Sequence, residues 1–188
     1  MRLVTAIVLA GVVPAMCLAQ GNLQDNLVAN GGFESGLEGW LTDVIVAPAE
    51  FVECTENVHS GETSLRIDLG ESARGFARSP AFEVEPGKQY RISVWATAEG
   101  APEDMVYARV HWWSGLPGVA SEEKIKDDTE HAGGTFDWKQ LTATVTAPAD
   151  AANATVRLET NGDTGVLNTE TDAEFVVRFD DLVVQPVE

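Results

Sequence analysis

Two segments of the chain, 89–98 and 106–113, carry aromatic and hydrogen-bonding side chains at every second position. Such a mixture suits ligands like sugars, whose rings present apolar C–H faces edged by hydroxyl groups. Aromatic rings stack on the apolar face of a sugar, while polar and charged side chains hydrogen-bond to its rim. We expect a ligand site built from six residues of these segments: Trp95, Trp113, Tyr107, Arg109, Arg91 and His111.

Alternation of this kind predicts two β-strands, because successive side chains of a strand point to opposite faces of a sheet. If the strands are neighbours on the concave face of one sheet, their outward residues form a single aromatic and basic strip. Arg66 and Arg157 hold comparable positions on other predicted strands, and arginines there would pair with a uronate or sulfate group of a ligand. The alternative is that Trp95 and one of Trp112 and Trp113 belong to the core, while the arginines pair with acids on adjacent strands.

No arrangement typical of a catalytic centre is present in the sequence. The segment 32–36 is not a G-x-S-x-G nucleophile elbow, because its serine stands one place off. The histidines, His59, His111 and His131, lack the short spacing of zinc ligands, and there is no phosphate-binding glycine loop. Cys54 has no recognisable nucleophile context. We therefore predict that the protein is not an enzyme.

The rest of the chain shows the same alternation in short stretches separated by turn signals such as Pro86-Gly87. No apolar pattern of helical period persists. These patterns predict an all-β fold of antiparallel strands, a sandwich or jelly roll. Besides the two segments above, the predicted strands are 64–69, 139–145, 155–159 and 175–179.

One segment departs from the strand pattern. Residues 121–130, with the sequence SEEKIKDDTE, are dense in charge. Charged runs are usually solvated, so we expect this segment to be a loop or a single exposed helical turn.

The N-terminus has the pattern of a cleavable secretory signal peptide. Arg2 precedes an apolar run over 3–13, and Cys17-Leu18-Ala19 supplies small residues for cleavage after Ala19. The run is too short to span a membrane, which takes about 20 residues. We therefore expect the folded domain over residues 20–188 and a secreted, extracellular or periplasmic location. Cleavage would leave Cys54 as the only cysteine, so a sizeable core or a metal must stabilise the fold in place of a disulfide.

The charge balance excludes some partners. The chain has 30 acidic residues against 12 Lys and Arg, and its formal net charge is −18. This excess repels nucleic-acid backbones and anionic lipid surfaces. We therefore expect neither a nucleic acid partner nor docking onto anionic lipid surfaces, and the short apolar run at the N-terminus predicts no membrane-spanning segment.

The sequence resembles the carbohydrate-binding modules of the family 4/9/22 type, which are galactose-binding-like β-jelly rolls. Five segments carry the resemblance and follow one another in the family's order, from the opening strand to the closing Asp-Asp strand. They are 26–36 with Trp40, 59–66, 84–95, 138–141 with 145–148, and 179–182. The resemblance implies this fold for nearly the whole of the chain after the signal peptide. It does not specify a sugar.

The resemblance also implies a structural calcium ion that joins the beginning of the chain to its end. Asp180 and Asp181 interrupt an otherwise apolar strand, and carboxylates there are costly to bury unless paired or metal-bound. Calcium prefers carboxylate and carbonyl oxygens. The implied ligands are the carboxylates of Glu34, Asp180 and Asp181 and the carbonyls of Gly32 and Ser60. The alternative is that Glu34 caps a turn and the Asp pair lies in water.

Together these observations predict a secreted, calcium-stabilised, non-catalytic module that binds a poly- or oligosaccharide. A glycoside-acting enzyme would then be a separate chain, since the last predicted strand ends close to Glu188. The competing hypothesis is a structural or adhesive surface protein that keeps the fold without a sugar site. Exposure of Trp95 and Trp113 on one face would favour sugar binding, and burial of both would favour the structural role.

Overall fold

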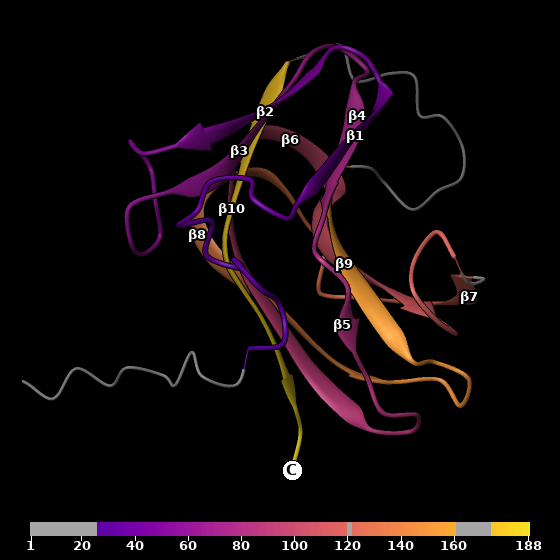
Figure 1. The fold of residues 1–188 in the computed structure, drawn as a ribbon. Coiled ribbons are helices and arrows are strands. Elements are labelled where there is room, and N and C mark those ends of the chain that lie inside the picture. The colour runs from indigo at the N-terminus through magenta and orange to yellow at the C-terminus, as the bar shows by residue number, and fades with distance from the viewer. Residues whose placement is uncertain (1–25, 120–121, 161–173) are drawn as a thin grey trace, which may run out of the picture.

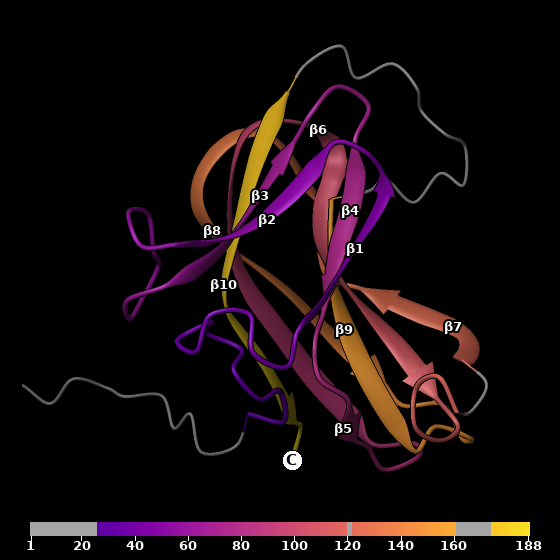
Figure 2. The same ribbon diagram turned by 45° about the horizontal axis from the view of Figure 1, so that its top comes forward.

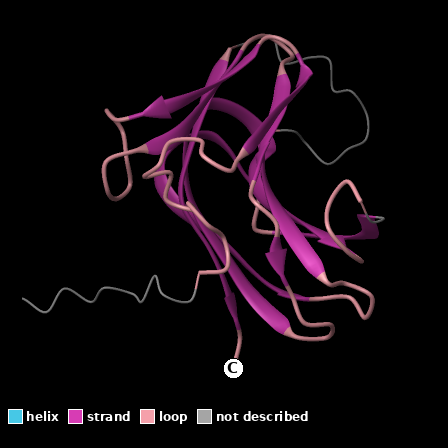
Figure 3. Ribbon diagram, in the orientation of Figure 1, coloured by secondary structure: helices cyan, strands magenta, loops and turns pink. Residues whose placement is uncertain are grey.

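The structure consists of antiparallel β-strands joined by loops and turns (Figure 3). It is a computed structural model that describes residues 26–119, 122–160 and 174–188. No helix occurs in these residues, so the predicted all-β class is confirmed; the signal peptide lies outside the described residues. The strands are β1 (Leu41–Val46), β2 (Ala49–Cys54), β3 (Ser64–Leu69), β4 (Arg74–Arg78), β5 (Phe82–Glu83), β6 (Gln89–Trp113), β7 (Glu122–Asp128), β8 (Ala132–Thr146), β9 (Asn153–Glu159) and β10 (Phe175–Pro186).

The strands form two layers that face each other as a sandwich (Figure 1). Sheet 1 contains β1, β4, β9, the C-terminal half of β6 and β7, with β5 beside β9. Sheet 2 contains β8, the N-terminal half of β6, β10, β3 and β2. Because β6 belongs to both sheets, the hydrogen-bonded ladder continues from one layer into the other.

A single strand of 25 residues therefore replaces the two separate strands predicted over 89–98 and 106–113. The chain turns from one sheet to the other between Gly100 and Met105, where its pairing with β8 shifts register. Gly100 and Asp104 have φ angles of 75° and 61°, a left-handed conformation that bends a strand without ending it. The two halves of β6 consequently face outward from opposite layers.

The core lies between the inner faces of the two sheets. From sheet 1, the alternate residues Val106, Ala108, Val110 and Trp112 point inward and are at most 1% exposed. Sheet 2 supplies the matching inward residues of β3, β6 and β10, of which Phe179 is fully buried. Trp112 thus belongs to the core, and its neighbour Trp113 belongs to the outer face.

The segment 121–130 is not a loop, and this prediction was wrong. Residues Glu122–Asp128 form β7, which pairs with the end of β6 at the edge of sheet 1 (Figure 2). Strand pairing uses backbone groups, and at a sheet edge charged side chains have access to water. Residues 120 and 121 lie outside the described residues.

The beginning of the described chain is held against its last strand. The backbone N–H of Leu27 donates to the carbonyl of Val184 at 2.9 Å, and the Asn26 amide donates to the carbonyl of Leu182 at 2.8 Å. Gly31 must be glycine here, because a Cβ atom would lie 2.1 Å from the Leu182 carbonyl oxygen. In the described part of the chain, no helix is long and apolar enough to cross a membrane.

Candidate functional site

The outer face of sheet 1 brings charged and aromatic side chains together on four adjacent strands. On β6 the outward residues are Tyr107, Arg109, His111 and Trp113, since the intervening residues enter the core. All four were predicted as ligand residues. Tyr107 and His111 are fully buried and Trp113 is 7% exposed, so neighbouring outward side chains cover their rings.

Strand register arranges these side chains in rows across the sheet. Arg78 of β4 lies opposite Arg157 of β9, Arg157 lies opposite Arg109 of β6, and Arg109 lies opposite Asp128 of β7. We call Arg78, Arg157 and Arg109 the arginine row. Neighbouring strands are separated by about 4.8 Å, so the row spans about 10 Å from its first to its last Cα atom.

The adjacent row contains Phe76, Glu159 and Tyr107, again one residue from each of β4, β9 and β6. Two guanidinium groups of the arginine row lie over its aromatic rings. The Arg157 guanidinium carbon is 4.2 Å from the centroid of the Phe76 ring, and that of Arg109 is 5.1 Å from the Tyr107 centroid. Such cation–π contacts hold a flexible arginine in one orientation.

Asp128 and His131 close one side of this face. Nε and Nη2 of Arg109 donate to the two carboxylate oxygens of Asp128, each at 2.6 Å, in a bidentate ion pair. The His131 ring stacks on Tyr107 with centroids 4.0 Å apart and has its Nε2 3.4 Å from Asp128. Tyr107 is fully buried beneath His131, whereas the His131 side chain is 24% exposed, so His131 provides the aromatic surface that solvent can reach.

Glu159 is the most perturbed acid of this face. It is 3% exposed, and burial raises its pKa to about 7, although Arg157 and Arg109 oppose the shift. Within the described residues, its Oε2 atom is buried without a hydrogen-bond partner. A carboxyl group in this state is half protonated near neutral pH, so it can donate a hydrogen bond as well as accept one.

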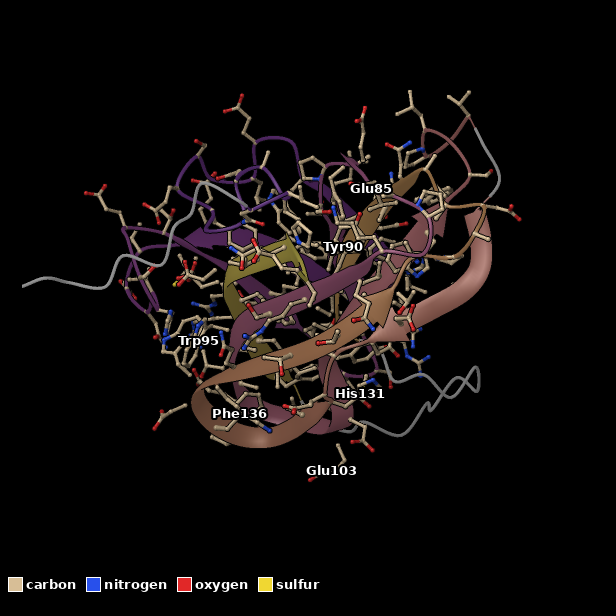
Figure 4. All side chains as sticks on the ribbon, turned by 90° about the horizontal axis from the view of Figure 1, so that it is seen from below. Glu85, Tyr90, Trp95, Glu103, His131 and Phe136 are labelled. Atoms are coloured by element: carbon tan, nitrogen blue, oxygen red, sulfur yellow. The ribbon has the colours of Figure 1, made fainter. Side chains whose placement is uncertain are left out.

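The other two predicted ligand residues, Arg91 and Trp95, lie on sheet 2. They occupy the N-terminal half of β6, where Trp95 pairs with Gln140 of β8 and Asp180 of β10. The prediction that both segments share one face is therefore wrong, because β6 changes sheets between them. Figure 4 shows Trp95 well separated from His131, which belongs to the sheet 1 face.

Trp95 packs against a loop. The His59 ring stacks on it with centroids 3.9 Å apart, and Trp138 meets the edge of the same imidazole at 5.7 Å. His59 in turn has its Nδ1 2.7 Å from a carboxylate oxygen of Asp181. This aromatic cluster holds the loop that follows β2 against β10. Trp95 is partly exposed and Trp113 is buried, so the two tryptophans are neither both exposed nor both buried.

The acids predicted as calcium ligands lie where the start of the chain meets β10. Asp180 is fully buried and accepts backbone N–H groups from His59, Ser60 and Asp181 at 2.9, 3.2 and 2.8 Å. Burial raises its pKa to about 6, against the effect of these hydrogen bonds. The Glu34 carboxylate accepts the backbone N–H groups of Glu62 and Thr63.

Residues 25–165 match a family described as a carbohydrate binding domain, CBM_4_9. The chain belongs to this carbohydrate binding domain family. The resemblance read from the sequence is thereby confirmed. A comparison with curated proteins gave no match.

Solved structures similar to this carbohydrate binding domain share its fold at low sequence identity. A tailspike protein 4 domain of bacteriophage CBA120 has a TM-score of 0.65 at 11% identity, over 86% of this chain and 21% of that one. A family 16 carbohydrate binding module-2 has a TM-score of 0.59 at 15% identity, over 87% of this chain and 100% of that module. A Clostridium thermocellum xylanase 10B fragment, which contains CBM22-1 and GH10 modules in complex with xylohexaose, has a TM-score of 0.57 at 18% identity. The match covers 86% of this chain and 29% of that fragment. The chain thus corresponds to a small part of the first and third proteins.

At the predicted calcium site of the carbohydrate binding domain, the predicted ligand atoms are all carboxylate or carbonyl oxygens. A cavity of about 450 Å³ is lined there by Gly32, Glu34, Ser60 and Asp181, among others. Oxygen-only donors suit a hard cation. However, no three His, Cys, Asp or Glu side chains in the described residues could hold a metal ion together. Backbone carbonyls would have to supply most ligands, and the Glu34 carboxylate already accepts the backbone N–H groups of Glu62 and Thr63.

Sequence reasoning missed several residues of the sheet 1 face in this carbohydrate binding domain. For Phe76, Arg78 and Glu159, alternation along β4 and β9 was the available signal, because it puts these residues outward on strands whose intervening residues are small or apolar. Their alignment with β6 depends on pairing between strands distant in sequence, which the pattern does not encode. The missed residues are Phe76, Arg78, Asp128, His131 and Glu159.

Proposed function

We propose that the protein is a secreted, non-catalytic module that binds a poly- or oligosaccharide on the outer face of sheet 1. Membership of the carbohydrate binding domain family supports a sugar ligand, and the N-terminal signal pattern supports secretion. The chemistry of the face supports the location. It combines a bidentate Arg109–Asp128 pair, the His131 ring and the Glu159 carboxyl group within neighbouring rows.

The observation that carries this proposal is the state of Glu159. Burying a carboxyl group without satisfying its oxygens costs free energy, and natural structures rarely leave such an atom without a partner. A ligand hydroxyl placed against Oε2 would remove that cost. In the same complex the exposed side of the His131 ring would stack on the apolar face of a sugar, and the binding would involve no covalent chemistry.

Substitutions on this face should weaken sugar binding, while a matched change on sheet 2 should not. We expect His131→Ala and Asp128→Asn each to raise the Kd for a bound polysaccharide about tenfold, on the order of 1.4 kcal/mol. Arg91→Ala removes an exposed arginine of sheet 2 and should leave the Kd unchanged. Affinity electrophoresis and isothermal titration calorimetry against xylan, β-1,4-galactan and acidic polysaccharides would measure these values.

The structural or adhesive role remains the second candidate, since the Tyr107 and Trp113 rings are covered and offer no open aromatic platform. Absence of binding to every polysaccharide tested would support that role. Binding that His131→Ala and Asp128→Asn leave intact, in variants with parental melting temperatures, would place the sugar elsewhere.

We also propose that calcium stabilises the junction between the start of the chain and β10. Glu34, Asp180 and Asp181 bring negative charge to this junction, and a cation would offset their repulsion. Removing calcium with EDTA should lower the melting temperature by about 5–10 °C, the loss expected for an ion present at about 100 times its Kd. Added CaCl₂ should restore it more effectively than MgCl₂. An unchanged melting temperature, with no calcium in elemental analysis, would contradict the proposal.

A further inference from the structure

We propose that Cys54 is a modification site, a thiol that a peroxide oxidises to a sulfenic acid whose oxygen accepts the Nε–H group of Arg178. This inference goes beyond the proposed function, because Cys54 lies on sheet 2 and takes no part in the sugar site on sheet 1. It stands on three observations, which are the surroundings of the sulfur, a buried donor beside it that has no acceptor, and the cavity that reaches it.

Strand register places Cys54 on the outer face of sheet 2, the face to which Arg178 also belongs. Cys54 lies opposite Ser64 of β3 at the end of β2. Two residues earlier, Val52 lies opposite Arg66, and Arg66 lies opposite Arg178 of β10. Residues two apart on a strand point to the same side of a sheet, so Cys54 and Arg178 share one face.

The surroundings of the sulfur favour the thiolate. Burial raises the pKa of the Cys54 thiol. Hydrogen bonds from the backbone at Asn57 and Glu56 and the nearby guanidinium group of Arg178 outweigh this effect and hold the pKa below its ordinary value. The thiolate, and not the thiol, attacks an oxidant, so this cysteine should react more readily than an ordinary buried one.

Arg178 has a buried donor that lacks an acceptor. Its Nη1 donates to the Glu99 carboxylate at 2.8 Å. The residue is 8% exposed, and among the described residues its Nε has no hydrogen-bond partner. Buried N–H groups are rarely left in this state, because an unsatisfied donor costs free energy. An oxygen atom added to the sulfur of Cys54 would supply the acceptor, since the guanidinium group lies beside that sulfur.

A cavity of about 270 Å³ reaches Cys54 and has room for the added oxygen. Its lining includes Val52, Glu53 and Arg66. Cys54 is only 8% exposed, so the opening suits a molecule the size of hydrogen peroxide better than the thiol of a second protein. The other cysteine of the sequence, Cys17, lies in the expected signal peptide, so no thiol of the cleaved chain would reduce the sulfenic acid.

The step is a two-electron oxidation of the sulfur. The Cys54 thiolate attacks one oxygen of hydrogen peroxide, so that an S–O bond forms and the O–O bond breaks. The hydroxide that leaves takes up the proton that the thiol released and becomes water. The sulfur loses two electrons, the peroxide gains them, and Cys54 becomes a sulfenic acid.

The test treats the full, folded chain with hydrogen peroxide and traps sulfenic acid with dimedone, which peptide mass spectrometry then locates. We expect a dimedone adduct on Cys54, and none in Cys54→Ser. Arg178→Gln should slow the labelling about fivefold, because a smaller fraction of the molecules carries the thiolate. Arg91→Gln, which replaces an exposed arginine of the same sheet, is the matched control and should leave the rate unchanged.

The melting temperature of the parent provides a measurement that does not depend on folding of the Arg178 variant. After oxidation the parent should melt a few degrees higher than the reduced protein, because the sulfenic oxygen satisfies the Nε–H group of Arg178. Cys54→Ser, treated with peroxide in the same way, reports the effect of oxidation at methionines and should show no rise.

Labelling of Cys54 only after unfolding in urea would overturn the inference. Equal labelling rates in the parent and a folded Arg178→Gln variant would also overturn it, as would an oxidised parent that melts no higher than the reduced one. These outcomes leave the proposed sugar binding untouched, because that proposal concerns the opposite sheet.

Discussion

Replacing Asp180 by alanine should lower the free energy of unfolding by about 3–5 kcal/mol. Its buried carboxylate accepts three backbone N–H groups, and alanine would leave them without an acceptor. Each buried donor left unsatisfied costs about 1–3 kcal/mol. The loss would separate the loop at His59 and Ser60 from β10. Urea denaturation followed by tryptophan fluorescence would measure the change.

Asp180→Asn distinguishes loss of the acceptors from loss of the charge. The amide keeps one oxygen acceptor but turns an N–H₂ group toward a backbone donor, so we expect an intermediate loss. Asp150→Ala, at an exposed turn position, is the control and should change the stability by less than about 0.5 kcal/mol. A loss below about 1 kcal/mol for Asp180→Ala would show that other contacts hold this loop. If the alanine variant does not fold, the asparagine variant carries the measurement.

Glu159 should make the protein less stable as the pH rises from about 5 to about 8. Burial raises its pKa in the folded protein from the ordinary value of 4.5 to about 7. Between these values the folded state binds a proton that the unfolded state has already released, so raising the pH favours unfolding. The full effect is on the order of 3 kcal/mol.

Glu159→Gln isolates this contribution, because glutamine keeps the shape of the protonated acid and does not titrate. We expect the stability difference between the variant and the parent to move in favour of the variant by a few kcal/mol from pH 5 to pH 8. Urea denaturation at several pH values would measure it, with Glu83→Gln at an exposed position of β5 as the control. A difference that does not change with pH would mean that Glu159 is ionised in the folded protein throughout this range.

Strand alternation was sufficient to predict the all-β class and to assign most side chains to the core or the outside. Val106, Ala108, Val110 and Trp112 enter the core as their spacing predicts. Alternation reports only which side of a strand a residue faces, and not which sheet the strand joins. Trp95 and Trp113 both face outward, but from opposite layers.

The crossing of β6 between the sheets could not be predicted, because its signals resemble those of a loop. The segment Glu99–Asp104 contains glycine, proline and acids, which usually end a strand, yet here the strand bends through residues of positive φ and continues. The charged strand β7 was missed for a related reason. Its backbone pairs with β6 whatever its side chains are, and only the tertiary structure provides that partner.

The candidate site was predictable in part. Tyr107, Arg109, His111 and Trp113 were identified from their alternation on one strand. Glu159 is one of 30 acidic residues, and the sequence around it has no feature that distinguishes it from the others as a site residue. Its importance arises from burial between Phe76 and Tyr107 of the neighbouring strands, which depends on contacts across the sheet.

The position of β10 has a consequence for how the chain acquires its structure during synthesis. This last strand lies inside sheet 2 between β6 and β3, and it also holds the segment that begins at Asn26. Until residues 175–186 have left the ribosome, β3 and β6 lack the strand that joins them, and the opening segment has nothing to bind. Native pairing is therefore dominated by contacts between distant parts of the chain, a topology that folds slowly and late. The domain therefore spends longer with the edges of β3 and β6 unpaired than a domain built from local contacts would, and such edges are prone to aggregation.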